Sequence, residues 1–290
     1  MDDISIAPRI EIKKVGVVGC GLMGGGYTQL CAQKGYQVVV SDVNDEILNR
    51  GLTLINSRLT EGVSRGELSD QDKNVIMARI KGITDLAEFS ECDLVLEAVV
   101  EKMELKKSIF AQLDKICPKD VVLATNTSVL SVLDIAMVTS RPDKVLGIHT
   151  SPLVFPGVEI VKSILTSNEA VQVAKKFGQS LGKHVFVAKD TPGFIMNRLL
   201  TPLFLSAIQM LESGVATRDV IDDAFIRGMG WPMGPFAMLD GAGLDTMLLA
   251  SNALYEELKD HQFVPPILLK KMVTAGWLGV KTGKGFYDYE

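Results

Sequence analysis

The chain of 290 residues is poor in several residue types, and each shortage excludes a class of protein. It has four cysteines, none in a Cys-x-x-Cys pair and none with a histidine at metal-ligand spacing, namely Cys20, Cys31, Cys92 and Cys117. We therefore expect reduced core thiols and no metal site. A net charge of −5, a pI near 5.4 and no long run of Lys or Arg argue against nucleic acid or an anionic membrane as partner.

Long uninterrupted apolar runs are also missing. The segment Leu199–Leu211 is among the longest, and it is interrupted by Thr201, Pro202, Ser206 and Gln209. The first five residues, Met1 to Ser5, are acidic where a signal peptide would be basic. We expect a soluble cytoplasmic protein without a membrane partner; a mature organellar protein that has lost its transit peptide would have the same features.

The first two thirds of the chain alternate between short β-branched runs and longer amphipathic segments. This alternation predicts a Rossmann-type α/β domain over residues 1–190, with a doubly wound, mostly parallel sheet. A helix opened by Ser167 lies between the last two strands. The expected strands are Val15–Val18, Val38–Val40, Asp93–Val99, Val121–Ala124, Val145–Ile148, Val158–Ile164 and Val185–Val187.

Strand patterns stop after residue 190, and an all-α domain is expected over residues 191–290. Thr191 is a candidate N-cap with Pro192 at the first helical position, and Phe194–Glu212 is apolar on nearly every face, which predicts burial on all sides. Further helices are expected after Thr217, with Val220, Ile221, Ala224 and Phe225 facing inward, over Gly243–Leu258, and from Pro265 to Gly276. Because this half is very apolar for its size, we expect a homodimer through the C-terminal helical domain.

The first expected strand runs into the sequence Gly19-Cys20-Gly21-Leu22-Met23-Gly24, and a helical segment follows. Glycines allow the tight turn and the close approach of backbone to a pyrophosphate, which the N-terminus of the helix then binds. The strand before and the helix after this pattern are the context that a dinucleotide site requires. We interpret Gly19, Gly21, Leu22, Met23 and Gly24 as cofactor-binding residues.

Asp42 closes the second expected strand, 18 residues after Gly24. A carboxylate at this place accepts hydrogen bonds from the adenosine ribose, and it would repel the 2′-phosphate of NADP, so the sequence favours NAD. The alternative is that Asp42 only caps the next helix.

The chain has three histidines, His149, His184 and His261. His149 follows the strand Val145–Ile148, so its ring is expected at the carboxyl end of the sheet, where open α/β folds bind ligands. His184 and His261 lie next to charged residues and are more simply explained as solvated. His149 is therefore the candidate acid–base residue.

Nearly the whole chain resembles the 3-hydroxyacyl-CoA dehydrogenase family, and in particular its bacterial 3-hydroxybutyryl-CoA dehydrogenases. The resemblance depends on several blocks that occur in the same order: the glycine-rich turn, Glu97-Ala-Val-Val-Glu101, Asn126-Thr-Ser128, His149 with Glu159, Thr191-Pro-Gly-Phe-Ile-Met-Asn197, Pro232-Met-Gly-Pro235, Gly243-Leu-Asp245 and Lys281-Thr-Gly-Lys-Gly-Phe-Tyr287.

The resemblance implies hydride transfer between carbon 3 of an (S)-3-hydroxyacyl thioester and NAD, a reaction of fatty-acid metabolism such as β-oxidation. By the same resemblance His149 is the general base, Glu159 is its partner, and Ser128 and Asn197 bind the substrate. It also implies that Glu101, Lys106, Ser128 and Lys281 line the cofactor. Simpler alternatives are a solvated Glu159 and surface charges at Glu101 and Lys106. Asn126-Thr-Ser128 is also formally a glycosylation sequon, but a cytoplasmic chain meets no glycosyltransferase, so that interpretation fails.

Two features depart from the family. The family usually has His-Phe-x-Asn-Pro, whereas this chain has His149-Thr150-Ser151-Pro152, and only ten residues separate His149 from Glu159, about two fewer than usual. Ser151 is then the nearest replacement for the missing Asn. The family also has a Lys that binds a CoA phosphate, and here Arg65 is the nearest match and Arg58 the second. The alternatives that follow are a dehydrogenase of a free hydroxy acid and an NAD-binding protein without turnover.

Overall fold

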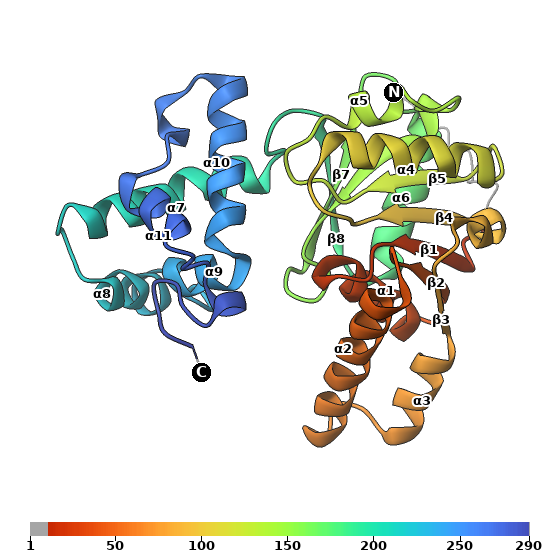
Figure 1. The fold of residues 1–290 in the computed structure, drawn as a ribbon, viewed down its shortest axis with the longest axis horizontal. Coiled ribbons are helices and arrows are strands. Elements are labelled where there is room, and N and C mark those ends of the chain that lie inside the picture. The colour runs from red at the N-terminus through yellow and green to blue at the C-terminus, as the bar shows by residue number, and fades with distance from the viewer. Residues whose placement is uncertain (1–10, 290) are drawn as a thin grey trace. The chain divides into compact units, whose positions relative to one another are not determined.

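The computed structural model describes residues 11–289. Contacts divide the chain into two units, Met1–Thr191 and Pro192–Glu290. The first unit contains a sheet with helices, as Figure 1 shows, and the second contains helices. The expected α/β architecture followed by an all-α part is confirmed.

One eight-stranded sheet has the order β3-β2-β1-β4-β5-β6-β7-β8. All neighbouring strands are parallel except β6 and β7, which are antiparallel. Apolar runs fill the central strands, as parallel strands buried on both faces require. The strands are β1 (Lys14–Val18), β2 (Gln37–Ser41), β3 (Ile80–Ile83), β4 (Leu94–Glu97), β5 (Val122–Thr125), β6 (Val145–His149), β7 (Gly157–Lys162) and β8 (His184–Lys189).

Most of the strands were expected from the sequence, but β3 was not. Its sequence, Ile-Lys-Gly-Ile, is short, and it pairs only with β2 at the edge of the sheet, where the apolar signal is weak. The expected strands Asp93–Val99 and Val158–Ile164 are shorter than predicted, because pairing ends at Glu97 and Lys162. All four cysteines are buried and unbonded to one another, which confirms the core thiols.

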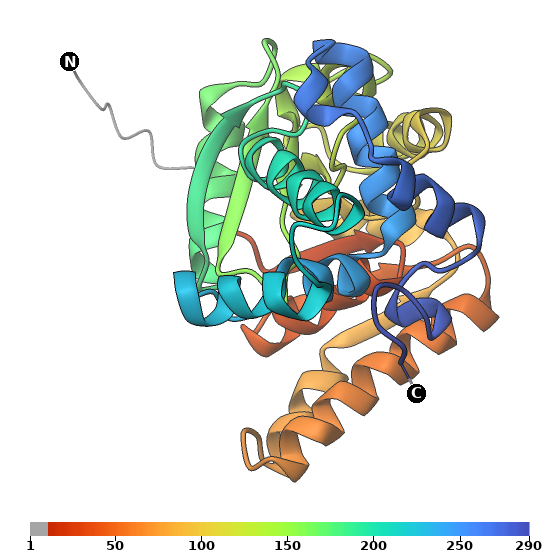
Figure 2. The ribbon, with the colours of Figure 1, turned by 90° about the vertical axis from the view of Figure 1, so that its left-hand side faces the viewer.

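The helices of the first unit connect the strands. They are α1 (Leu22–Gln33), α2 (Asp45–Ser64), α3 (Asp70–Ala78), α4 (Met103–Ile116), α5 (Val132–Ala136) and α6 (Asn168–Ser180). Ser167 caps α6, as expected, by accepting a hydrogen bond from the Ala170 N–H. Figures 1 and 2 both show α2 and α3 as a pair that projects from the sheet of this unit.

The second unit is built from α7 (Met196–Glu212), α8 (Arg218–Asp223), α9 (Pro235–Ala242), α10 (Leu244–Leu258) and α11 (Ile267–Thr274), and α9 was not expected. The predicted N-cap at Thr191 is wrong: Gly193 and Phe194 have φ of 73° and 49°, so the chain leaves helical geometry and α7 begins only at Met196. The helix is not buried on all sides either, since Leu199 is 70% exposed.

Side chains after Thr217 also differ from the prediction. Ile221 and Phe225 are buried, as expected, whereas Val220 and Ala224 are exposed. The two buried residues are four apart, as are the two exposed ones, so the inward-facing side of this segment is narrower than predicted. A π-helical turn over Ala224–Gly228 follows α8.

Candidate active site

The turn between β1 and α1 has the geometry of a dinucleotide loop. Gly19 has φ of 96°, and a Cβ at Gly24 would lie 1.8 Å from the Gly19 carbonyl oxygen, so neither position accepts a side chain. A Cβ at Gly21 would meet no atom within 4 Å. This open space lies at the N-terminus of α1, where Leu22 and Met23 place N–H groups without intrahelical partners. The residues present fit a pyrophosphate.

Asp42 is directed at this loop. Its carboxylate accepts a hydrogen bond from the Cys20 N–H at 2.8 Å and a second from the Val43 N–H at 2.7 Å. The helix cap is Asn44, whose side chain accepts from the Ile47 N–H, so the interpretation of Asp42 as a mere cap is wrong. A carboxylate beside the glycine turn fits recognition of a ribose diol.

His149 and Glu159 face each other across the antiparallel pair β6–β7. The Nδ1 atom of His149 lies 2.7 Å from Oε2 of Glu159. The Glu159 side chain is fully buried and that of His149 is 11% exposed, so the alternative of a solvated glutamate is wrong. The shorter connection between the two residues still closes the pair, because the strand register sets them directly opposite.

Ser128 follows β5, the strand beside β6, and lies at the carboxyl edge of the parallel part of the sheet. Its N–H donates to Oε1 of Glu101 at 2.8 Å. The same oxygen accepts from the Thr127 hydroxyl and from the Val129 N–H. Glu101 therefore fixes the backbone of the segment that carries Ser128.

Lys106 lies in α4 with its side chain only 1% exposed. Its ammonium is 2.7 Å from Glu97 and 3.3 Å from Glu101. The alternative of two surface charges is wrong, because the Lys106 side chain is almost fully buried and that of Glu101 is largely buried. Glu97 was part of a recognised sequence block but was given no role, although a charged residue at the end of an otherwise apolar strand was a usable signal.

The second unit carries the other two expected site residues. Asn197 is the second residue of α7. Lys281 forms an ion pair with Asp245, the second residue of α10, with Nζ–Oδ distances of 2.5 and 2.6 Å. Asp245 was part of the recognised sequence block but was given no role.

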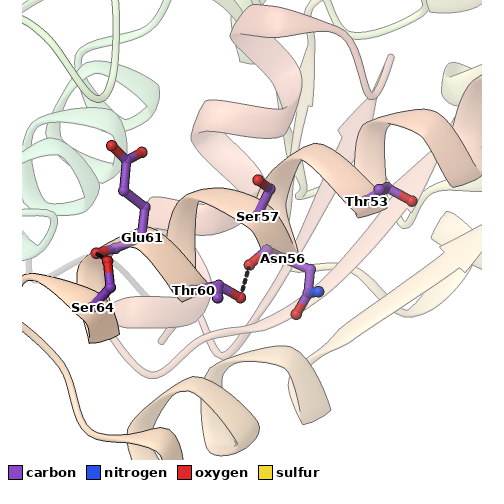
Figure 3. Close-up of a pocket in the computed structure, with 6 residues that line it drawn as sticks. All are labelled: Thr53, Asn56, Ser57, Thr60, Glu61 and Ser64. Atoms are coloured by element: carbon purple, nitrogen blue, oxygen red, sulfur yellow. Dashed lines mark hydrogen bonds between the residues drawn. The ribbon is translucent and has the colours of Figure 1, made fainter.

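The residues considered for CoA lie on the first unit. Ser151 forms a turn in which its carbonyl accepts from the N–H groups of Val154 and Phe155. Arg65 caps the C-terminus of α2 and pairs with Glu61, and both side chains are largely exposed. An open pocket lies along one polar face of α2, as Figure 3 shows, and is lined by Thr53, Asn56, Ser57, Thr60, Glu61 and Ser64.

His184 and His261 are exposed, in agreement with the sequence interpretation. Within residues 11–289, no group of three or more His, Cys, Asp or Glu side chains is arranged to hold a metal ion. The same residues include no helix with the length and apolarity that crossing a bilayer requires.

Comparison with known proteins decides the family. Residues 14–191 match the NAD binding domain of 3-hydroxyacyl-CoA dehydrogenase, and residues 193–289 match its C-terminal domain. The chain belongs to the 3-hydroxyacyl-CoA dehydrogenase family. It is accordingly an NAD-dependent oxidoreductase of that family, as the sequence predicted.

Individual members of the 3-hydroxyacyl-CoA dehydrogenase family are similar over almost their whole length. A 3-hydroxybutyryl-CoA dehydrogenase of Bradyrhizobium diazoefficiens is 40% identical over 96% of both chains. The crystal structure of M. tuberculosis FadB2 has a TM-score of 0.93 and 39% identity, covering 97% of this chain and 100% of that one. The (S)-3-hydroxybutyryl-CoA dehydrogenase PaaH1 from Ralstonia eutropha has a TM-score of 0.88 and 38% identity, with the same coverage.

Proposed function

We propose that this member of the family interconverts short-chain (S)-3-hydroxyacyl-CoA and 3-ketoacyl-CoA, with His149 as the general base and acid. The observation that carries the proposal is the 2.7 Å contact between His149 Nδ1 and the buried Glu159 carboxylate. With Nδ1–H donated to Glu159, the other ring nitrogen, Nε2, is the basic one. A histidine held in this tautomer is suited to accept a hydroxyl proton and to return it.

Glu159 contributes through its charge. When Nε2 takes the proton of the C3 hydroxyl, the ring becomes an imidazolium, and a buried carboxylate at 2.7 Å stabilises that cation. NAD, when bound, supplies the acceptor for the hydride that leaves carbon 3. In the reverse direction His149 returns the proton to the alkoxide oxygen, and Ser128 and Asn197 hydrogen-bond the substrate oxygen and thioester.

We assign the cofactor to the glycine turn and its surroundings. Gly19, Gly21 and Gly24 leave room for a pyrophosphate, and Asp42 accepts from the ribose hydroxyls. Leu22 and Met23 supply N–H groups at the start of α1. Glu101 is carried over from the family as a cofactor residue, and the buried Lys106 acts behind it by fixing its carboxylate. Lys281 is likewise a cofactor residue by family resemblance alone.

The CoA moiety is assigned to the polar face of α2. Arg58 of the same helix supplies a positive charge near this face, and its Nη1 has no hydrogen-bond partner within the described residues. Arg65 at the end of the same helix adds a second guanidinium, and Ser151 replaces the usual Asn as the group that orients the thioester.

A second candidate is a dehydrogenase of a free hydroxy acid. Two observations favour it: Arg65 is already paired with Glu61, and the loop after His149 is short. Oxidation of NADH is therefore measured with acetoacetyl-CoA and, in parallel, with free acetoacetate and with NADPH. Fast oxidation only with NADH and the thioester supports the proposal, equal rates with the free acid support the second candidate, and no oxidation despite NADH binding contradicts both.

The roles of the dyad are tested with three single substitutions. His149→Asn and Glu159→Gln each remove one member, and we expect kcat to fall by about two to four orders of magnitude for the first and somewhat less for the second. His184→Asn is the matched control, because His184 is exposed. An active His149→Asn protein would contradict the assigned base.

We also propose that the chain forms a homodimer through its C-terminal helical unit and acts in the cytoplasm. Large apolar side chains are exposed on the helices of this unit and on the segments between them, including Leu199, Val215, Val220, Met229 and Ile267. Four unpaired cysteines fit a reducing compartment. Light scattering of the full chain measures the assembly, and a monomeric mass would contradict the dimer.

A further inference from the structure

The backbone immediately before His149 is held by two side chains from other elements. Tyr27 of α1 donates its hydroxyl to the Ile148 carbonyl at 3.0 Å. Asn126, which follows β5, donates its amide to the same carbonyl at 2.8 Å and to the Tyr27 hydroxyl at 3.2 Å. The carbonyl that precedes the candidate base therefore accepts two hydrogen bonds.

The backbone after His149 is held by Thr150. Its hydroxyl donates to the Gly157 carbonyl at 2.6 Å, and the residue is 2% exposed. Gly157 is the first residue of β7, and Glu159 lies two residues further on. This hydrogen bond joins the two residues that flank the loop of residues 151–156. It therefore connects the strand of His149 to the strand of Glu159.

These polar groups lie in a buried environment. Tyr27 is 1% exposed and Asn126 is 8% exposed. Burial also raises the pKa of the Tyr27 hydroxyl well above its usual value, so the group stays a neutral donor. Because these buried groups cannot exchange their protein partners for water, their hydrogen bonds hold the backbone in one arrangement.

We infer that Tyr27 and Thr150 are positioning residues for the His149–Glu159 dyad. Tyr27 fixes the end of β6, and Thr150 fixes the start of β7 relative to it. The Thr150 bond offers a reason why a connection about two residues shorter than usual keeps Nδ1 and Oε2 at 2.7 Å. Loss of either hydroxyl lets the ring shift, and a misplacement of about 1 Å can lower the rate by as much as about 10²-fold.

The inference also links the dyad to the cofactor loop. Tyr27 lies three residues after Gly24, in the first turns of the helix that the glycine turn opens. Its hydroxyl therefore ties the dinucleotide end of α1 to the strand that carries His149. The inference rests on the proposed function, in which this ring is the base.

The test compares Tyr27→Phe and Thr150→Val with two controls. Thr150→Ser keeps the hydroxyl. Thr166→Val removes a hydroxyl that donates to the Val145 carbonyl at the opposite end of β6, at 2.8 Å. We expect kcat to fall about tenfold in Thr150→Val and several-fold in Tyr27→Phe, with the Kd for NADH unchanged and both controls within about twofold of wild type.

Nitrogen NMR of the histidine rings provides a readout independent of turnover. The chain has three histidines, so His184 and His261 serve as internal references. We expect the ring signals of His149 to change in Tyr27→Phe and Thr150→Val and to stay unchanged in the controls.

The outcomes separate the two hypotheses. Unchanged kcat and unchanged His149 signals in both variants would overturn the inference, as would an equal loss of kcat in Thr166→Val. Wild-type protein inactive on acetoacetyl-CoA would count against the proposed function alone, and the NMR result would still decide the inference. If Thr150→Val does not fold, the kcat and the His149 signals of Tyr27→Phe decide the inference by the same criteria.

Discussion

Lys106 and Glu97 form an ion pair inside the first unit: Nζ and Oε1 are 2.7 Å apart, and the side chains are 1% and 0% exposed. Glu97 also accepts from the Val99 N–H and the Thr125 hydroxyl, so both of its oxygens are occupied. Through Lys106 the network reaches Glu101 and the segment of Ser128. A buried pair joined in this way links the ends of β4 and β5 to the candidate site.

Breaking this buried pair is expected to be costly. Glu97→Gln removes the nearer of the two carboxylate charges that compensate the Lys106 ammonium and leaves only Glu101, so we expect a loss of about 3 kcal/mol in the free energy of unfolding. Urea denaturation at neutral pH measures it. Glu91→Gln is the matched control, because Lys14 and Glu91 lie 2.6 Å apart with Glu91 exposed to solvent, and we expect its effect on the free energy of unfolding to be much smaller. Equal losses in the two variants would contradict the role of burial.

Asp42 is expected to determine the choice of cofactor. Asp42→Ala removes an acceptor for the ribose hydroxyls and the repulsion toward a 2′-phosphate, so we expect the affinity for NADH to fall about tenfold and that for NADPH not to fall. Fluorescence titration of each nucleotide gives the two Kd values. Asp45→Ala, an exposed carboxylate in the first turn of α2, controls for net charge. An unchanged ratio of the two Kd values would contradict the assignment.

Asp114 is expected to make stability depend on pH. Burial raises the pKa of its carboxyl, but hydrogen bonds from Ser140 and Arg141 outweigh that effect and lower the pKa to about 2. Since this value lies below that of the unfolded chain, the stabilisation is complete above about pH 5 and is lost as pH falls toward 2. We expect Asp114→Asn to cost about 2 kcal/mol at pH 7 and about half as much at pH 3.

Urea denaturation of wild type and Asp114→Asn at several pH values between 7 and 3 checks this prediction. Asp93→Asn is a comparison in the same domain, because its carboxylate accepts from the N–H groups of Lys13 and Lys14 without an arginine. The prediction would be contradicted if the difference in free energy of unfolding between wild type and Asp114→Asn stayed constant from pH 7 to pH 3.

The thiols are expected to be unreactive in the folded protein. Burial raises the pKa of Cys20 and Cys117 to about 11 and that of Cys92 to about 12, so almost no thiolate is present at pH 8. Reaction with an aromatic disulfide reagent should be slow in buffer and should reach four thiols per chain in urea. Rapid modification of the native protein at Cys20 would contradict the burial of this thiol.

The sequence was sufficient for the parts of the fold that depend on local pattern. Runs such as Val38–Val40 predicted strands because parallel strands are apolar on both faces, and the glycine turn was recognisable because only glycine fits its backbone. The short edge strand β3 and the start of α7 were not predicted correctly. Strand β3 forms because it pairs with β2, which its own sequence does not indicate. Helix α7 starts later than predicted because Gly193 and Phe194 have positive φ.

The candidate site divides in the same way. The chemistry of His149 and Asp42 was predicted from their place after strands, and family resemblance supplied Glu159 and Ser128. That Glu159 is buried against His149, that Lys106 is enclosed with Glu97, and that Tyr27 and Thr150 hold the backbone around His149 did not follow from spacing. These contacts join residues up to 121 positions apart, so strand order and register decide them.

The amino-acid sequence by itself determined which residue types stand at the ends of the strands, and with them the class of reaction and the cofactor. The tertiary structure decided which of those groups are desolvated and which meet. A carboxylate, an ammonium and a phenol acquire their roles from burial and from partners within 3 Å, and both properties arise only when distant segments pack together.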